Sequence, residues 1–281
     1  MKKPQDVKVH RFQGSLFPVN AWLVETPSAV VAVDATLGVT DGRALRQRAE
    51  ALGKPLAGVI VTHSHPDHYG GVAPLLGRDA VPVYAVAGVD AAIRRDDDAK
   101  EQILRPMFGD EWARQRAFPS RIVKGGEEVR IGGAVFRVFD VGPGESPHDS
   151  WWVLDGGGPP QAFVGDLAYS HMHAYLADGH YEQWLANLER ARRDVPAAAM
   201  LLMGHGEPVA GHALLEWQTV YIRTVLRELK AGMSQGLDGD ALADHVTTRM
   251  QQYLPGEDLL FLLRLSVAPL QARLRAKPAA T

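Results

Sequence analysis

The sequence predicts an α/β protein in which two layered β-sheets pack between outer helices. Two observations predict this fold. Segments with strand and helix character follow one another as strands, helix, strands, helix and strand. Polar side chains that can bind metals come directly after several apolar strands, and in layered α/β proteins the loops at strand carboxyl ends build the site. With 281 residues, of which 46% are hydrophobic, the chain can bury a substantial core.

Composition narrows the classes of protein and site. The formal net charge of -3 disfavours binding to nucleic acid and to anionic membranes. No apolar stretch is as long as a membrane span and the first eight residues are polar, so we expect a cytoplasmic protein without a membrane partner. There is no cysteine, which excludes disulfides and thiolate metal sites. Any metal must therefore be held by His, Asp and Glu.

The first half of the chain alternates between strands and helices. Three short strands rich in Val, Leu and aromatic residues open it, at 7–12, 21–25 and 29–34. Thr40 or Asp41 can then N-cap a helix that Gly53 ends. A nearly continuous apolar run at 56–61 predicts a strand buried on both faces.

A strand at 82–86 and a helical region at 88–118 follow, and the charge run inside that region predicts a solvated helix face. The rest of the chain predicts a second group of strands and then mostly helices. The strands are expected at 128–131, 135–141, 150–154, 162–164 and, later, 198–203. Apolar spacing predicts helices at 181–194, 213–230, 239–253 and 258–276.

The turn at 63–68 is the strongest functional signal in the sequence. It carries His63, His65, Asp67 and His68 between the strand at 56–61 and a Gly-Gly pair. Imidazole and carboxylate groups bind Zn²⁺, Mn²⁺ or Fe²⁺, and four of them on one turn allow two adjacent ions to share a loop.

Three further strand ends carry candidate ligands. Glu145 and His148 follow the strand at 135–141, Asp166 follows the strand at 162–164, and His205 follows the strand at 198–203. Each signal is weak alone, since an Asp or a His in a turn often only binds nearby backbone. Together with residues 63–68 they form a four-point pattern.

This pattern resembles the metallo-β-lactamase fold superfamily of metallohydrolases, whose signature is His-x-His-x-Asp-His, then Gly-His, a bridging Asp and a final His. The resemblance implies an αββα sandwich. It also implies a catalytic domain over residues 1–210, with a helical insertion at about 88–118, and a helical extension at 211–281 that packs on the same domain.

By this resemblance two divalent metal ions bind side by side. The implied ligands of the first are His63, His65 and a residue of the loop after Pro143 and Gly144; those of the second are Asp67, His68 and His205; Asp166 bridges the two. The family usually has Pro-Gly-His where this chain has Pro143-Gly144-Glu145. Glu145 occupies the aligned position, and His148 is the alternative third ligand. Zinc is the default metal, while a carboxylate ligand favours manganese or iron.

The implied activity is that of a dinuclear metallohydrolase. A metal-bound hydroxide would attack the carbonyl of a small-molecule ester, thioester, lactone or amide, and Asp67 would orient it. Asp34 either supports a ligand histidine or caps the turn after its strand. Tyr169 resembles the Asp-x-x-Tyr arrangement of lactonases, in which the phenol stabilises an oxyanion, although a core tyrosine is an equal alternative.

His171 and His173, two residues apart on an expected extended segment, line the substrate pocket or lie on the surface. Phe17, Trp22, Met107, Phe108 and Trp112 either form an apolar pocket wall or belong to the core.

Two other functions remain compatible with the sequence. One is a mononuclear iron dioxygenase of the persulfide dioxygenase type, because one fold hosts several chemistries. The other is a catalytically silent, metal-stabilised binding protein. Assembly as a homo-oligomer is also compatible with the sequence. The substrate itself is not readable, because specificity would depend on residues 88–118, the loop 169–180 and the carboxyl-terminal helices.

Overall fold

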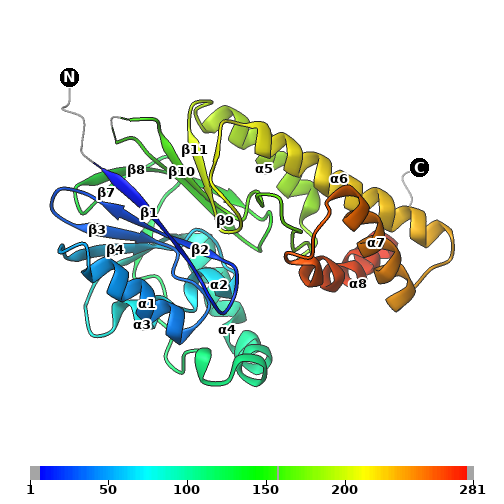
Figure 1. Ribbon diagram of the computed structural model, residues 1–281, viewed down its shortest axis with the longest axis horizontal. Helices are drawn as coiled ribbons and strands as arrows, with labels where there is room; N and C mark the ends of the chain where they lie inside the picture. Colours follow the sequence, from blue (N-terminus) through cyan, green and yellow to red (C-terminus); the bar gives the residue numbers. More distant parts are fainter. Residues whose placement is uncertain (1–6, 157, 277–281) are drawn as a thin grey trace.

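A computed structural model describes residues 7–156 and 158–276 as two six-stranded sheets packed face to face, with helices on both outer faces (Figure 1). The first sheet contains, in spatial order, β1 (Lys8–Gln13), β2 (Asn20–Glu25), β3 (Val30–Val33), β4 (Leu56–Ile60), β5 (Val83–Val86) and β6 (Arg121–Val123). Strands β1 to β3 are antiparallel, and β3 to β6 are parallel.

The second sheet is mostly antiparallel. It contains, in spatial order, β12 (Val209–Ala210), β11 (Met200–Met203), β10 (Gln161–Gly165), β9 (Asp149–Leu154), β8 (Ala134–Gly142) and β7 (Glu128–Ile131). Only β10 and β11 pair in parallel within it. This order confirms the predicted αββα sandwich.

The alternation of side chains along β9 shows how the layers are held together. All six of its residues are buried. Trp152 and Leu154 pack into the core between the sheets, whereas Trp151 and Val153 pack into the core beneath the outer helices. Because both faces of the strand are covered, its last four residues are all apolar and do not alternate with polar residues.

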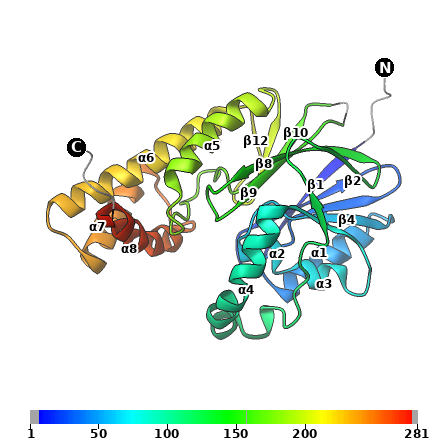
Figure 2. The same ribbon diagram turned by 180° about the vertical axis from the view of Figure 1, so that it is seen from behind.

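Helices cover the two outer faces in order of sequence (Figures 1 and 2). On the first sheet lie α1 (Val39–Glu50), α3 (Val72–Leu76) and α4 (Ala87–Phe108); on the second lie α5 (Tyr181–Asp194) and α6 (Ala213–Ser234). Helix α7 (Gly239–Tyr253) packs on α6, and α8 (Leu260–Ala276) packs on α7. That residues 211–281 form an extension of the same catalytic domain stays a prediction. No helix in the part of the chain that the structure describes combines the length and apolar character needed to cross a membrane.

The structure corrects two sequence expectations and adds elements that were not predicted. The helix expected at 88–118 is wrong beyond Phe108, where Gly109, at φ 56°, ends it; a short 3₁₀ turn, η1 (Gly109–Glu111), follows, and the chain then enters the unpredicted β6. Neither Thr40 nor Asp41 is the N-cap of α1, since Gly38 holds that place. The Asp41 carboxylate instead accepts hydrogen bonds from the loop after β1. The short helices α2 (Pro66–Tyr69) and α3 were also not predicted.

The two sheets meet at one edge, where the carboxyl ends of several strands come together. A β-bridge joins His63, after β4, to Asp149 at the start of β9. Asn20 donates its side-chain amide to the carbonyls of Met203 and Gly206, which ties β2 to the loop after β11. The loops after β3, β4, β8, β10 and β11 are thereby brought to the same place.

Candidate metal centre

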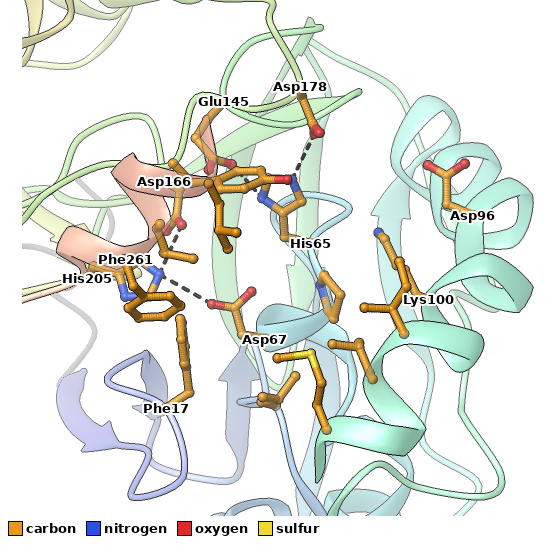
Figure 3. A pocket seen from close by; sticks show the side chains of 18 of the residues that line it. Phe17, His65, Asp67, Asp96, Lys100, Glu145, Asp166, Asp178, His205 and Phe261 are labelled. Atoms are coloured by element: carbon orange, nitrogen blue, oxygen red, sulfur yellow. Dashed lines mark hydrogen bonds and ion pairs between the residues drawn. The ribbon is translucent and has the colours of Figure 1, made fainter. Parts of the chain in front are cut away.

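Two groups of side chains come together at this edge of the sheets, and Figure 3 labels His65, Glu145, Asp67 and His205 among them. The first contains His63, His65 and Glu145, and the second contains Asp67, His68 and His205. Within each group one potential ligand atom from every residue lies within 4.8 Å of the others. These are the two sets implied by the sequence resemblance, with Glu145 in the third position.

Asp166 lies between the two groups. Its Oδ2 is 3.1 Å from Nε2 of His205 and 3.9 Å from Nε2 of His63. Its Oδ1 is 3.4 Å from Nε2 of His68. The residue follows β10, whose last residue, Gly165, turns the chain at φ 52°. One carboxylate therefore reaches both halves of the centre.

Each of the four imidazoles has its second nitrogen occupied. The pairs are His63 Nδ1 with the Thr62 hydroxyl at 3.1 Å, His65 Nε2 with Asp178 at 2.9 Å, His68 Nδ1 with Asp34 at 2.9 Å, and His205 Nδ1 with the Pro18 carbonyl at 2.7 Å. Metal-binding histidines usually donate their second N–H in this way, which fixes the tautomer and the direction of the ring. The remaining nitrogens all point into the centre.

The backbone around Asp34 is strained in a way that serves this arrangement. Asp34 and Thr36 have φ values of 59° and 66°, a region that non-glycine residues rarely adopt. This conformation lets one Asp34 oxygen accept from the Thr62 backbone N–H while the other accepts from the Thr62 hydroxyl and contacts His68. Asp34 therefore has the contacts of a supporting carboxylate.

Glycines allow the loops to approach one another. A Cβ placed on Gly204 would lie 2.0 Å from Oδ1 of Asp166, and one placed on Gly71 would lie 1.9 Å from the Ala35 carbonyl. Both positions therefore exclude any larger residue unless the loops move.

The loop after β8 brings Glu145, and not His148, into the centre. Oε2 of Glu145 is 2.7 Å from Nδ1 of His65. Asp149 fixes the loop by accepting from the backbone N–H of Glu145 and from Ser146. His148 instead binds Asp140 at 2.7 Å through Nε2, and its ring packs against Gly88.

Tyr169 connects the two halves of the centre. Its phenol oxygen is 2.9 Å from Oε1 of Glu145 and 2.9 Å from Oδ2 of Asp166. Burial, together with the charges of Asp166 and Glu145, holds the pKa of the phenol well above its ordinary value. Tyr169 is thus a protonated donor at neutral pH that faces both carboxylates.

The pKa shifts of Glu145 and His205 favour the uptake of protons, so the centre favours positive charge. Burial raises the pKa of Glu145 to about 8, despite the neighbouring His65. Burial alone would lower the pKa of His205, but Asp166 and Asp67 raise it to about 10. Nε2 of His63, Nε2 of His68 and Oδ1 of Asp166 are buried without a well-aligned hydrogen bond. Once these protons are released, buried imidazoles and carboxylates are the donor set of divalent cations, so these residues fit a metal site.

His171 and His173 do not line the cavity, and the extended segment expected for them is wrong. His171 has φ 58° and packs its exposed ring against Trp217. His173 is buried, and its Nδ1 lies 3.0 Å from the hydroxyl of Tyr221. The left-handed turn at His171 directs the two side chains to different surroundings.

A cavity of about 440 Å³ opens above the centre. Phe17, Met107 and Phe108 line it, whereas Trp22 and Trp112 are buried in the core. The sequence assigns specificity to the segments that carry Asp178, Lys100 and α8, but it does not single out these residues as lining the cavity. All three reach the cavity only through tertiary contacts, so no local signal could have found them.

Comparison with known proteins gives the same assignment. The sequence model of the metallo-beta-lactamase superfamily matches residues 14–205. The chain is 26% identical over 168 residues to a hydroxyacylglutathione hydrolase of Albidiferax ferrireducens, which covers 60% of this chain and 54% of that enzyme. The chain spans about half the length of the first curated relatives that it matches.

Two solved structures extend the comparison. The metallo-beta-lactamase family protein TTHA1429 of Thermus thermophilus superposes with a TM-score of 0.67 at 22% identity, over 97% of this chain and 93% of that chain. TTHA1623 in a di-iron-bound form superposes with a TM-score of 0.57 at 25% identity, over 74% of this chain and 98% of that chain. The family match covers more than half of the chain, and the layers agree with it. The chain therefore belongs to the metallo-β-lactamase superfamily.

Proposed function

We propose that this protein is a dinuclear metallohydrolase that cleaves a small-molecule ester, thioester, lactone or amide. The observation that carries the proposal is the fixed orientation of four imidazoles, whose free nitrogens converge with three carboxylates in two groups joined by Asp166. A structural site needs only one closed set of four ligands, whereas two open groups beside a cavity are typical of hydrolytic centres.

In this proposal His63, His65 and Glu145 hold one divalent cation, and Asp67, His68 and His205 hold the other. When bound, the cations would lower the pKa of a water molecule and polarise the substrate carbonyl. We expect both ions to be zinc, and iron is the main alternative because TTHA1623 has been solved in a di-iron-bound form.

The protein's own side chains would position the attacking water and donate a hydrogen bond to the substrate. The attraction of His68 and His205 outweighs the effect of burial and holds the pKa of Asp67 well below its ordinary range. Its carboxylate therefore stays ionised and would accept a hydrogen bond from the attacking water, which orients it. The Tyr169 phenol stays protonated and would donate to the oxygen that becomes negative as water adds to the carbonyl. His65, held by Asp178, would keep its ring facing the cavity floor.

Metal analysis combined with a substrate panel tests the proposal. The purified protein should bind two divalent ions and hydrolyse p-nitrophenyl acetate, a thioester or a lactone in a metal-dependent reaction. One iron per chain without hydrolysis would instead support the iron dioxygenase. Full metal loading without turnover across the panel would support a silent binding protein.

A further inference from the structure

Two helices that are far apart in the sequence form opposite sides of the cavity. Helix α4 contributes Ile103 and Met107, and helix α8 contributes Phe261 and Leu265. In Figure 3, Phe261 lies on one side of Asp67 and Lys100 of α4 lies on the other. The polar centre is therefore the floor, and the sides above it are largely apolar.

These four side chains are unusually open to solvent for apolar residues. Ile103, Met107, Phe261 and Leu265 are exposed to 60%, 66%, 51% and 60%. In each helix the two residues are four positions apart, so they form one stripe along one face. Four of the seven large apolar side chains that are exposed among the described residues thus line one cavity. Exposed apolar groups gathered at one place usually mark a binding surface.

We propose that this cavity binds a substrate with an extended apolar chain, held between α4 and α8 while its carbonyl lies over the metal centre. The inference rests on the proposed hydrolase function and names its substrate class. The reaction is ordinary hydrolysis: water adds to the carbonyl carbon, the bond to the leaving oxygen, sulfur or nitrogen breaks, and the leaving atom takes up a proton.

The shape of the site favours a small molecule over a second protein chain as the occupant. The four side chains line the same cavity as Asp67, at the polar floor. Its volume of about 440 Å³ falls within the range of about 300–1,000 Å³ that is usual for small-molecule pockets. An apolar substrate chain that extends from the polar floor would cover both the α4 and the α8 stripes.

Binding of straight-chain carboxylates tests the inference without requiring turnover. Calorimetry on the zinc-loaded protein should show the Kd falling about fourfold for each added methylene from butanoate to decanoate, because each buried methylene contributes a roughly constant free energy. The double variant Met107→Ser/Leu265→Ser should bind decanoate at least about tenfold more weakly and butanoate unchanged. Val220→Ser is the matched control, since Val220 is 49% exposed on α6, outside the cavity.

Two ester series then show on which side of the scissile bond the chain lies. One series runs from p-nitrophenyl acetate to p-nitrophenyl decanoate, and the other from methyl to decyl acetate. The series whose kcat/KM rises with chain length identifies an apolar acid or an apolar alcohol.

Carboxylate affinities that do not depend on chain length would overturn the inference, even if short esters are hydrolysed and the hydrolase function stands. Chain-length-dependent binding without turnover of any ester would instead overturn the proposed function and leave the apolar site in place. Light scattering covers the remaining outcome: if the double variant only converts a dimer to a monomer and keeps the wild-type affinities, the stripes are an interface between copies and the inference fails.

Discussion

The two halves of the candidate centre have the same donor composition but different supports. Each contains two imidazoles and one carboxylate and shares Asp166. His68 is held by the buried Asp34, which directly follows β3 and has a strained backbone. His65 is held by Asp178, a half-buried residue of a loop that lines the cavity. Two metal sites with the same types of ligand can therefore differ in metal affinity, because the residues that support their ligands differ in burial.

Glu145 explains why the donor sets are alike. With a histidine in its place the first half would hold three neutral imidazoles, as the family pattern usually does. If Glu145 binds the first cation as proposed, its carboxylate would lower the positive charge of the loaded centre by one unit and weaken that cation as a Lewis acid. Four predictions, in order of decreasing effect, test how far the two halves differ.

Replacing the shared carboxylate should have the largest effect. In Asp166→Ala we expect the affinity for both metal equivalents to fall at least about 100-fold and hydrolysis to be lost, because both halves lose a contact. Asp140→Ala is the matched control, since Asp140 binds only His148 outside the centre. Metal content after dialysis measures both variants. Loss of only one equivalent from Asp166→Ala would show that the residue serves one half alone.

Removing the phenol of Tyr169 should impair turnover but not metal binding. For Tyr169→Phe we expect kcat to fall about 100-fold with little change in KM, the usual effect of removing one oxyanion donor. Metal content and the unfolding midpoint should stay close to wild type. An unchanged kcat with a lower unfolding midpoint would mean that Tyr169 is only a core residue.

The supporting carboxylates should differ in importance. Asp34→Asn should weaken metal binding about 10- to 100-fold, as is usual for a supporting residue. Asp178→Asn should cost less than about tenfold, because water can reach His65 and replace the lost contact. Competition with a chromophoric chelator gives both affinities. Equal losses would remove the difference between the two supports.

Metal affinity should rise with pH. The pKa of His205 is raised to about 10 in the metal-free protein, so at pH 7 its imidazole carries a proton that a cation must displace. Raising the pH from 6 to 9 should therefore tighten binding by up to about tenfold per pH unit for each proton released. Calorimetry in two buffers of different ionisation enthalpy counts the protons. Binding that releases no protons would contradict this ionisation state.

Local patterns in the sequence predict the fold and the polar floor, because both depend on strand ends. The spacing of residues 63–68 and the positions of Glu145, Asp166 and His205 after apolar runs identify the residues that the structure brings together. The side-chain contacts of Asp178 and the Pro18 carbonyl are long-range, so no local pattern reveals them. The prediction that His171 and His173 face the same side is wrong because His171 has a left-handed backbone conformation, which breaks the alternation of an extended segment.

In the cavity walls, too, the sequence predicts the helices but not their tertiary contacts. Residues 88–118 read as one helix because their charges and apolar residues keep a helical period, yet Gly109 ends α4 and the rest of the segment returns to the sheet. Helix α8 is predicted as an element, but its position opposite α4 depends on the packing of three helices. The sequence therefore indicates which segments form the substrate side of the site, whereas only the three-dimensional structure reveals which of their residues face the cavity.

The most direct test of the account is the number of metal ions per chain in Glu145→Ala and His148→Ala, measured by mass spectrometry beside the wild type. We predict two equivalents for the wild type, one for Glu145→Ala and two for His148→Ala, because Glu145 lies 2.7 Å from His65 while His148 binds Asp140. Two equivalents in Glu145→Ala together with one in His148→Ala would contradict the account.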